Sequence, residues 1–252
     1  MLRAIFSLLV FTLLLSNPAL ADQVLEYKET IGGEVSTFKV AVLEKTDKTI
    51  KLQAESSTGS KVYSELNGND GSNVLWEKTK DEQKITAVRT DNQVDVRIEK
   101  KGKSELKNYE IDEAPWIQSR EFGMRGFADD PEVKELKFWA LNPSDSSMMK
   151  MIGTRQEEKR IKCGDRVFEA FRVKVTLDGW KSIFWSSEFW FRKSDGVFLK
   201  YKGSASGPNS PEVVSELVKE EKSASPIPTA LAPAADPIGI ILAKIKTSLN
   251  HP

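Results

Sequence analysis

Residues 171–179 read FRVKVTLDG and contain the pattern that decides the fold. Apolar side chains occupy every second position from Phe171 to Leu177, and Arg, Lys and Thr occupy the positions between them. Because successive side chains of a β-strand point to opposite faces, this alternation predicts a strand with one buried face. The Asp178-Gly179 pair that follows is typical of a tight hairpin turn.

The same alternation recurs in residues 50–55, IKLQAE, and in residues 94–99, VDVRIE. Glycine-containing turns separate such segments at intervals of roughly ten residues. The clearest of them are Gly32-Gly33, Asp70-Gly71, Lys101-Gly102, Asp178-Gly179 and Asp195-Gly196. The rhythm from about residue 24 to residue 222 predicts a mainly β protein whose strands form an antiparallel meander.

The composition excludes one class of function and permits a globular fold. The chain of 252 residues has 37 Lys plus Arg against 37 Asp plus Glu, so its net charge is zero. A polycationic nucleic-acid binder is therefore excluded, and we expect no nucleic-acid partner. The apolar content of 39% is sufficient for an ordinary hydrophobic core.

The first 21 residues have the pattern of a secretory signal peptide. Arg3 provides the positive charge, residues 4–15 form an apolar stretch, and Ala19-Leu20-Ala21 matches an A-x-A cleavage signature. The alternative, a transmembrane anchor, needs about 20 apolar residues, more than this stretch has. We expect cleavage after Ala21, a periplasmic or secreted location, and no transmembrane segment in the mature protein.

Cys163 is the single cysteine, so the exported chain cannot form an internal disulfide. A dimerising or reactive thiol is one interpretation of this residue. We favour the other, a small apolar residue that packs just before a turn at Gly164-Asp165.

Residues 110–131 follow neither the strand nor the helix period. They mix apolar side chains with Gln, Arg and four glycine or proline breaks. We predict a long crossing loop with one helical turn, and a lid is the functional hypothesis for it, because long apolar loops inside compact domains are usually functional.

The composition changes after residue 222. Residues 223–236 are rich in Ala, Ser and Pro and predict a linker between the β-rich domain, residues 22–222, and a short amphipathic helix over residues 237–250. The apolar positions of this helix are Ile238, Ile241, Leu242, Ile245 and Leu249. A helix this short is marginal alone, so either it docks on its own domain, a protein partner or a membrane surface, or it is disordered.

The search for catalytic residues is mostly negative. His251, the single histidine, is the penultimate residue, so the β-rich domain has no Ser-His, Cys-His or histidine-based zinc arrangement. Carboxylate doublets such as Asp112-Glu113 would point to opposite faces of a strand. The run from Asn67 to Gly71 is better explained as a hairpin turn than as a calcium loop. We predict no enzymatic activity, with a carboxylate-based or Ser/Lys-based activity as the alternative, and no metal or cofactor.

Aromatic side chains are the positive signal. Trp180, Phe184, Trp185, Phe189, Trp190 and Phe191 crowd one hairpin. They occupy both parities of the predicted strand, so some must lie on a second face, which we expect to line a cavity. We predict that Arg120 or Arg125 pairs with an acidic head group there. The predicted ligand-binding residues are Trp116, Arg120, Phe122, Arg125, Phe127, Trp139, Trp185 and Trp190.

Two stretches resemble an uncharacterised bacterial periplasmic family, a domain of unknown function. Residues 163–173, CGDRVFEAFRV, resemble a glycine-led strand of the form G-x-F/Y-x-A/C-x-x-V. Residues 189–201, FWFRKSDGVFLKY, match a hairpin of the form W-F/Y-x-x-x-x-G-x-x-L-K-Y, and residues 24–33 fit the family's opening hairpin. The resemblance covers roughly residues 24 to 220, and the family is similar in fold to the lipoprotein-carrier (LolA/LolB-like) superfamily.

The resemblance implies a curved antiparallel meander that forms a half-open or closed barrel around an apolar cavity, with one or two short helices. The function that follows is an exported, non-enzymatic periplasmic protein that binds an apolar or lipid-like ligand within a curved β-sheet. The alternative is a cell-envelope interaction or assembly protein that has no small-molecule ligand and contacts its partner through residues 237–250.

Overall fold

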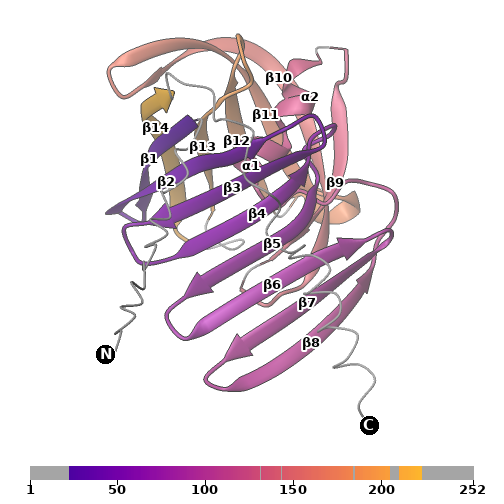
Figure 1. Cartoon of the computed structure of the whole chain (residues 1–252). Helices are drawn as coiled ribbons and strands as arrows, with labels where there is room; N and C mark the ends of the chain where they lie inside the picture. The colour runs from indigo at the N-terminus through magenta and orange to yellow at the C-terminus, as the bar shows by residue number, and fades with distance from the viewer. Residues whose placement is uncertain (1–22, 131, 143, 184, 205–209, 223–252) are drawn as a thin grey trace, which may run out of the picture.

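The computed structural model describes residues 23–222, apart from residues 131, 143, 184 and 205–209 (Figure 1). The predicted signal peptide (1–21), linker (223–236) and terminal helix (237–250) lie outside the described residues. Within the described part, no helix is long and apolar enough to cross a membrane.

Nearly all of the regular structure in the described residues is β. The strands are β1 (Gln23–Ile31), β2 (Glu34–Lys45), β3 (Thr49–Ser56), β4 (Lys61–Asn67), β5 (Asn73–Lys80), β6 (Gln83–Thr90), β7 (Gln93–Lys100), β8 (Lys103–Glu110), β9 (Glu135–Leu141), β10 (Met148–Cys163), β11 (Arg166–Leu177), β12 (Ser186–Arg192), β13 (Phe198–Ser204) and β14 (Glu212–Lys222). The helical elements are α1 (Arg120–Gly123), α2 (Arg125–Asp129) and the 3-10 helix η1 (Gly179–Ile183).

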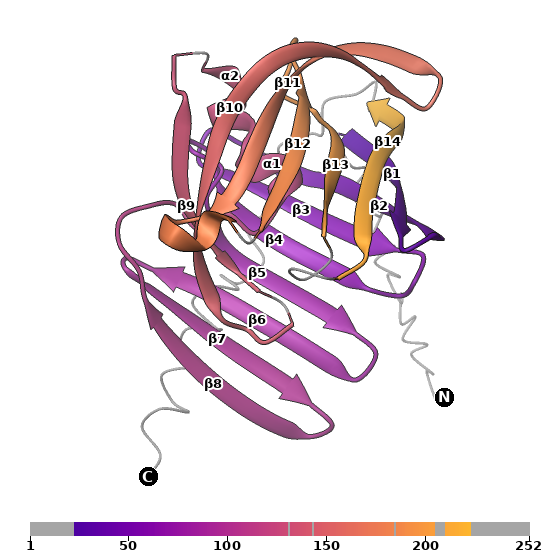
Figure 2. The ribbon, with the colours of Figure 1, turned by 180° about the vertical axis from the view of Figure 1, so that it is seen from behind.

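The strands form one antiparallel sheet in the order β8-β7-β6-β5-β4-β3-β2-β1-β14-β13-β12-β11-β10-β9. Every sequential pair is hydrogen-bonded except β8 and β9, and β1 pairs with β14 to join the two ends of the meander. Figures 1 and 2 show β1–β8 and β9–β14 as two curved walls with α1 between them. The predicted meander is confirmed, and of the two predicted forms it is the half-open one, because the edge strands β8 and β9 do not pair.

The three alternating segments of the sequence fall in β3, β7 and β11. In β11, Phe171, Val173 and Val175 are buried, while the residues between them are more exposed. The predicted turns are confirmed at Gly33, with a φ of 97°, and at Gly71, with a φ of 72°, because these backbone conformations are ones that other residues rarely adopt. The tight hairpin turn predicted at Asp178-Gly179 is wrong: the 3-10 helix η1 begins at Gly179, and β12 begins only at Ser186.

Stacked aromatic rings form the centre of the core. The Phe191 ring is fully buried and its centroid lies 5.7 Å from that of Phe171 and 5.8 Å from that of Phe198. Tyr27 of β1 donates a hydrogen bond from its hydroxyl to the Phe198 carbonyl, at 3.1 Å. This hydrogen bond links β1 to β13 and therefore adds a side-chain contact across β14 to the backbone pairing of β1 with β14.

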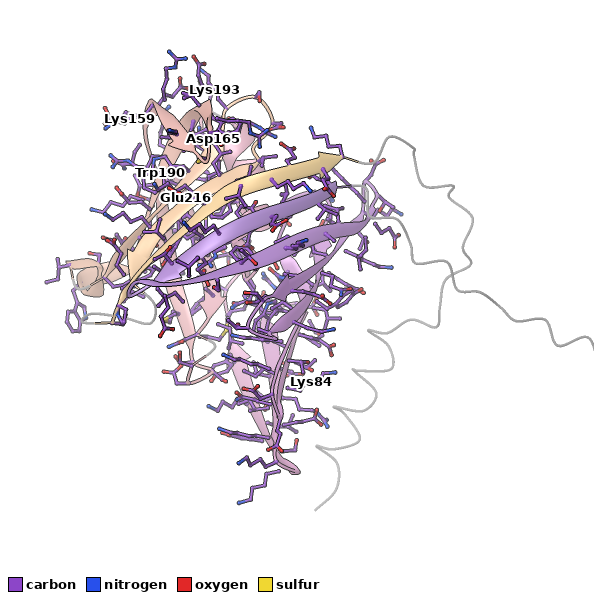
Figure 3. The ribbon with its side chains drawn as sticks, turned by 90° about the vertical axis from the view of Figure 1, so that its left-hand side faces the viewer. Lys84, Lys159, Asp165, Trp190, Lys193 and Glu216 are labelled. Atoms are coloured by element: carbon purple, nitrogen blue, oxygen red, sulfur yellow. The ribbon has the colours of Figure 1, made fainter. Side chains whose placement is uncertain are left out.

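The β10–β11 hairpin extends beyond the wall and bends back onto its outer face. A register shift between Arg155 and Glu158 accompanies the bend, as is usual for a β-bulge. Figure 3 shows Lys159 and Asp165 of the hairpin near Trp190 and Glu216. The bend brings the Cys163 thiol to 3.6 Å from the Leu199 carbonyl oxygen.

Cys163 is buried and ends β10 just before the turn, as the sequence predicts. Burial raises the pKa of its thiol to about 11. Since the thiolate is the reactive form, this environment does not activate the thiol at neutral pH.

Residues 111–134 cross the open seam between β8 and β9. The Ile117 amide donates to the Trp139 carbonyl, and the Trp139 amide donates to the Pro115 carbonyl, both at 2.8 Å. On the other side, the Asn73 amide donates to the Trp116 carbonyl at 2.7 Å. The segment thus supplies partners to the edge strand β9 and to the start of β5, and it contains two short helices where we predicted a crossing loop with one helical turn.

We predict that Phe191→Ala destabilises the protein by about 3 to 5 kcal/mol, because it removes a fully buried ring from the aromatic stack. Urea unfolding followed by circular dichroism measures this. Val167→Ala, at a side chain that is 57% exposed, is the control and should change stability by less than about 0.5 kcal/mol. Equal effects of the two substitutions would contradict the described core.

Candidate functional site

A cavity of about 720 Å³ lies inside the curved sheet. Residues from both walls and from the crossing segment line it, so it exists only because β1 and β14 join the walls. Most of the lining is apolar, and its larger members are Phe38, Leu52, Trp76, Met124, Phe138, Met149, Met151, Leu177, Trp185 and Phe189.

The cavity reaches the end of the sheet at which β1, β5 and β11 end. Ile31, Lys80 and Leu177 are the last residues of these strands, and all three line it. We call this end the mouth. At the opposite end α1 packs against the β4–β5 turn. The two backbones lie so close that a Cβ atom added to Gly71 would be 3.2 Å from the Cα atom of Gly123. Arg120 and Glu121 of α1 line the cavity at this helical floor, together with Met124, which follows α1 directly.

A network of polar side chains lies within the cavity. Arg120 reaches Glu121 at 3.2 Å and Glu29 of β1 at 3.8 Å, and its guanidinium group lies 4.6 Å from the centre of the Tyr201 ring. Glu29 also accepts a hydrogen bond from Ser215 at 2.9 Å. Carboxylates of the same chain therefore balance the positive charge of Arg120. Burial raises the pKa of the neighbouring Tyr201 hydroxyl.

Lys78 of β5 is a second cation of the lining. Burial lowers the pKa of its ammonium group, and the nearby charges of Lys80 and Arg120 lower it further, while Glu29 opposes the shift. Lys78 is half-buried, and this environment disfavours the positive charge of its ammonium group.

Of the eight predicted ligand-binding residues, the structure places Arg120 and Trp185 in the lining of this cavity. Trp116, Phe122 and Phe127 are buried in the core around the crossing segment. Arg125 stacks over the Phe122 ring at 3.7 Å. The binding role of these residues remains a prediction.

Trp139 and Trp190 have other surroundings. The Trp139 indole donates to Asp112 at 2.7 Å, which ties β9 to the crossing segment. Trp190 pairs in register with Arg172 on β11 and Lys200 on β13. Its neighbours Phe189 and Phe191 are buried in the core, so Trp190 lies on the outer face of the sheet. Aromatic side chains of this hairpin therefore lie on both faces, as the sequence predicts.

Lys78 was missed by sequence reasoning, although a signal for it existed. Trp76, Lys78 and Lys80 share one parity of β5 and all line the cavity. The signal was ambiguous because Leu75, on the opposite parity, is also apolar and is buried on the other face.

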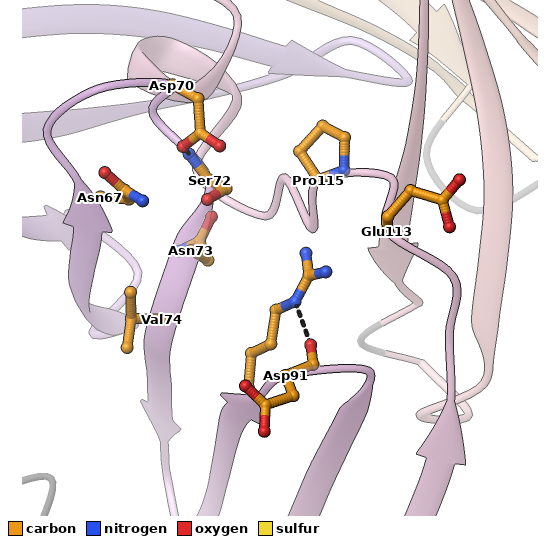
Figure 4. Close-up of a pocket in the computed structure, with 9 residues that line it drawn as sticks. Asn67, Asp70, Ser72, Asn73, Val74, Asp91, Glu113 and Pro115 are labelled. Atoms are coloured by element: carbon orange, nitrogen blue, oxygen red, sulfur yellow. Dashed lines mark hydrogen bonds between the residues drawn. The ribbon is translucent and has the colours of Figure 1, made fainter.

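A second, smaller pocket of about 310 Å³ lies where the crossing segment leaves β8 (Figure 4). Arg89 lines this pocket and donates to the carbonyls of Asp91 at 2.9 Å and Ala114 at 3.0 Å. Asp70 and Glu113 also line it, yet the described residues contain no group of three or more His, Cys, Asp or Glu side chains that could hold a metal ion. Arg89 therefore fixes the crossing segment, and the run at Asn67–Gly71 is the hairpin turn that we expected.

Asp112 holds the crossing segment against the second wall. Its carboxylate accepts hydrogen bonds from Lys150 of β10 and from the Trp139 indole. The hydrogen bond from Lys150, which has the larger effect, and the one from Trp139 lower the pKa of Asp112 to about 2. The carboxylate thereby joins β9, β10 and the segment that lines the cavity.

Comparison with known proteins supports the fold. No protein-family model matches the chain, and no curated protein matches its sequence. A beta-barrel-like protein of domain of unknown function DUF1849 from Brucella abortus is similar in structure, with a TM-score of 0.58 and 9% identity, over 81% of this chain and 98% of that one. The hypothetical lipoprotein YmcC from Escherichia coli (K12) aligns with a TM-score of 0.34 and 8% identity, over 81% of this chain and 89% of that one. The first likeness confirms, at the level of fold alone, the expected resemblance to a barrel-like domain of unknown function.

We predict that Asp112→Asn lowers the melting temperature at pH 7 and that the difference from the wild type shrinks as the pH falls from about 4 to about 2. A carboxylate with a lowered pKa stabilises the fold above its ordinary pKa and loses this contribution as the pH falls through the folded value of about 2. Scanning calorimetry across this range is the measurement. Asp165→Asn, in an exposed turn, is the control, and a difference that is constant with pH would contradict the role of Asp112.

Proposed function

We propose that this chain is an exported, non-enzymatic periplasmic protein that holds an apolar or lipid-like ligand in the cavity between its two walls. The observation that carries the proposal is the cavity itself. Its volume of about 720 Å³ falls within the range of about 300 to 1,000 Å³ typical of ligand pockets, and its lining is mostly apolar.

The arrangement of the lining supports a ligand with a long apolar part. Phe138 and Met151 line the interior, while polar residues such as Ser60, Lys80 and Asn142 line the cavity near the mouth. Moving an alkyl chain from water into such a lining is favourable by about 0.8 kcal/mol for each methylene group. Burial of a chain of a dozen carbons or more would therefore contribute strongly to binding, and holding such a ligand requires no catalytic residue.

The proposed location rests on the predicted signal peptide with cleavage after Ala21. An exported carrier of apolar ligands needs a cavity that shields the ligand from water. The half-open sheet supports this requirement, because one end carries the helices α1 and α2 and the other end is the mouth.

A second candidate is an interaction or assembly protein of the cell envelope. The observation that favours it is the 3-10 helix η1, where Trp180 is 73% exposed and Ile183 is 80% exposed. Exposed side chains of this size are typical of contact surfaces. The predicted contact through residues 237–250 lies outside the described residues.

We predict that Ala54→Trp weakens the binding of a dansyl-labelled fatty acid by about tenfold or more, because the indole would occupy space inside the cavity. Fluorescence titration of the purified mature protein measures the affinity. Gln53→Trp is the matched control: it lies on the same strand, next to Ala54, and is not part of the lining.

The two proposed functions make different claims about this titration. Wild-type binding that Ala54→Trp abolishes and Gln53→Trp preserves supports the ligand-binding function. Binding that both variants retain, or a wild type that does not bind, would contradict it and favour the interaction protein.

A further inference from the structure

We propose that the ligand is an anionic amphiphile whose head group is held near the mouth by Lys78 and Lys80 while its alkyl chain extends toward Met124 and α1. This inference rests on the proposed function and specifies its substrate class. It assigns a binding role to two lysines of one strand, on the cavity side of β5.

The positions of the two lysines set a gradient from apolar to charged along one wall. Trp76, Lys78 and Lys80 are successive cavity-facing residues of β5, and all three line the cavity. Trp76 is buried, Lys78 is half-buried and Lys80 is exposed at the end of the strand. A ligand that lies along this wall would meet an apolar surface in the interior and two ammonium groups as it approaches the mouth.

The neighbours of Lys78 on the sheet do not neutralise it. Its cross-strand partners are Val62 on β4 and Ile85 on β6. By contrast, Lys84 on the adjacent strand pairs with Glu77 at 3.0 Å. Within the part of the chain that the structure describes, no carboxylate lies within 4.0 Å of the ammonium group of Lys78 or of Lys80.

The carboxylates of the lining are occupied elsewhere. Glu121 pairs with Arg120, and Glu29 lies beside Arg120 and accepts a hydrogen bond from Ser215. Glu55, near the mouth, pairs with Lys61 at 3.2 Å. The charge of Lys78 is therefore left for a group from outside the described chain, and an anion is the group that a half-buried cation favours.

The lowered pKa of Lys78 agrees with this geometry, since burial together with Lys80 and Arg120 disfavours its protonated form. A cation kept in such a place destabilises the free protein. An anionic head group would remove this cost on binding, because a hydrogen bond between charged partners is stronger than one between neutral groups.

The test compares ligands that share a sixteen-carbon chain and differ in their head group, which is anionic in two of them and neutral in the third. Hexadecanoate, hexadecyl phosphate and hexadecanol are titrated at neutral pH as competitors of the uncharged probe N-phenylnaphthylamine, with the wild type, Lys78→Met and Lys28→Met. Lys28 is the matched control, because it is an exposed lysine on the outer parity of β1. Methionine retains most of the length of the lysine side chain and removes its charge.

We expect the wild type and Lys28→Met to bind the two anions about tenfold or more tightly than the alcohol. Lys78→Met should lose most of this preference while it binds the probe and the alcohol as the wild type does. The anion that binds more tightly shows whether the site prefers a carboxylate or a phosphate head group. Without ligand, Lys78→Met should also melt at a higher temperature than the wild type, which a merely structural lysine would not cause.

Two results would overturn the inference while leaving the proposed function intact. One is equal affinity of the wild type for hexadecanoate, hexadecyl phosphate and hexadecanol. The other is a Lys78→Met variant that weakens all ligands and the probe to the same extent. Failure of the wild type to bind the probe or any competitor would instead contradict the proposed function.

Discussion

The pairing of β1 with β14 is the constraint on which the rest of this structure depends. It joins the two ends of a linear meander into one continuous sheet and moves the gap to β8 and β9, which follow one another in sequence. Unpaired backbone groups at a sheet edge require partners, and the crossing segment supplies them at Trp139. The same segment thereby enters the sheet's interior and becomes part of the cavity lining.

Local pattern was sufficient to predict the strands. The alternation in residues 50–55, 94–99 and 171–177 corresponds to β3, β7 and β11, and the glycine turns lie between strands, because burial of one face and positive φ angles are local requirements. The burial of Cys163 before a turn followed from the same reasoning. Residues 110–131 departed from both periods, and this departure correctly marked the segment that crosses the seam.

The arrangement of the walls could not be predicted in the same way. The β1–β14 pairing links residues nearly the whole length of the domain apart, and no local pattern specifies it. Strands with apolar side chains on both parities, such as those at Leu75 and Trp76 or at Phe189 and Trp190, do not indicate which face meets the cavity. This ambiguity explains why Trp190 was expected in the cavity and stands in the outer row, and why Lys78 was missed.

Long-range pairing forms the cavity, and β5 places two lysines toward its mouth. On this basis we propose that the cavity carries an amphiphile. Native mass spectrometry of the mature protein, purified from its own envelope, tests this claim most directly. We expect one small molecule per chain, which denaturation releases and which proves to be an alkyl chain with a single anionic head group. A mass equal to that of the bare chain, unchanged after incubation with extracted envelope lipid, would contradict it.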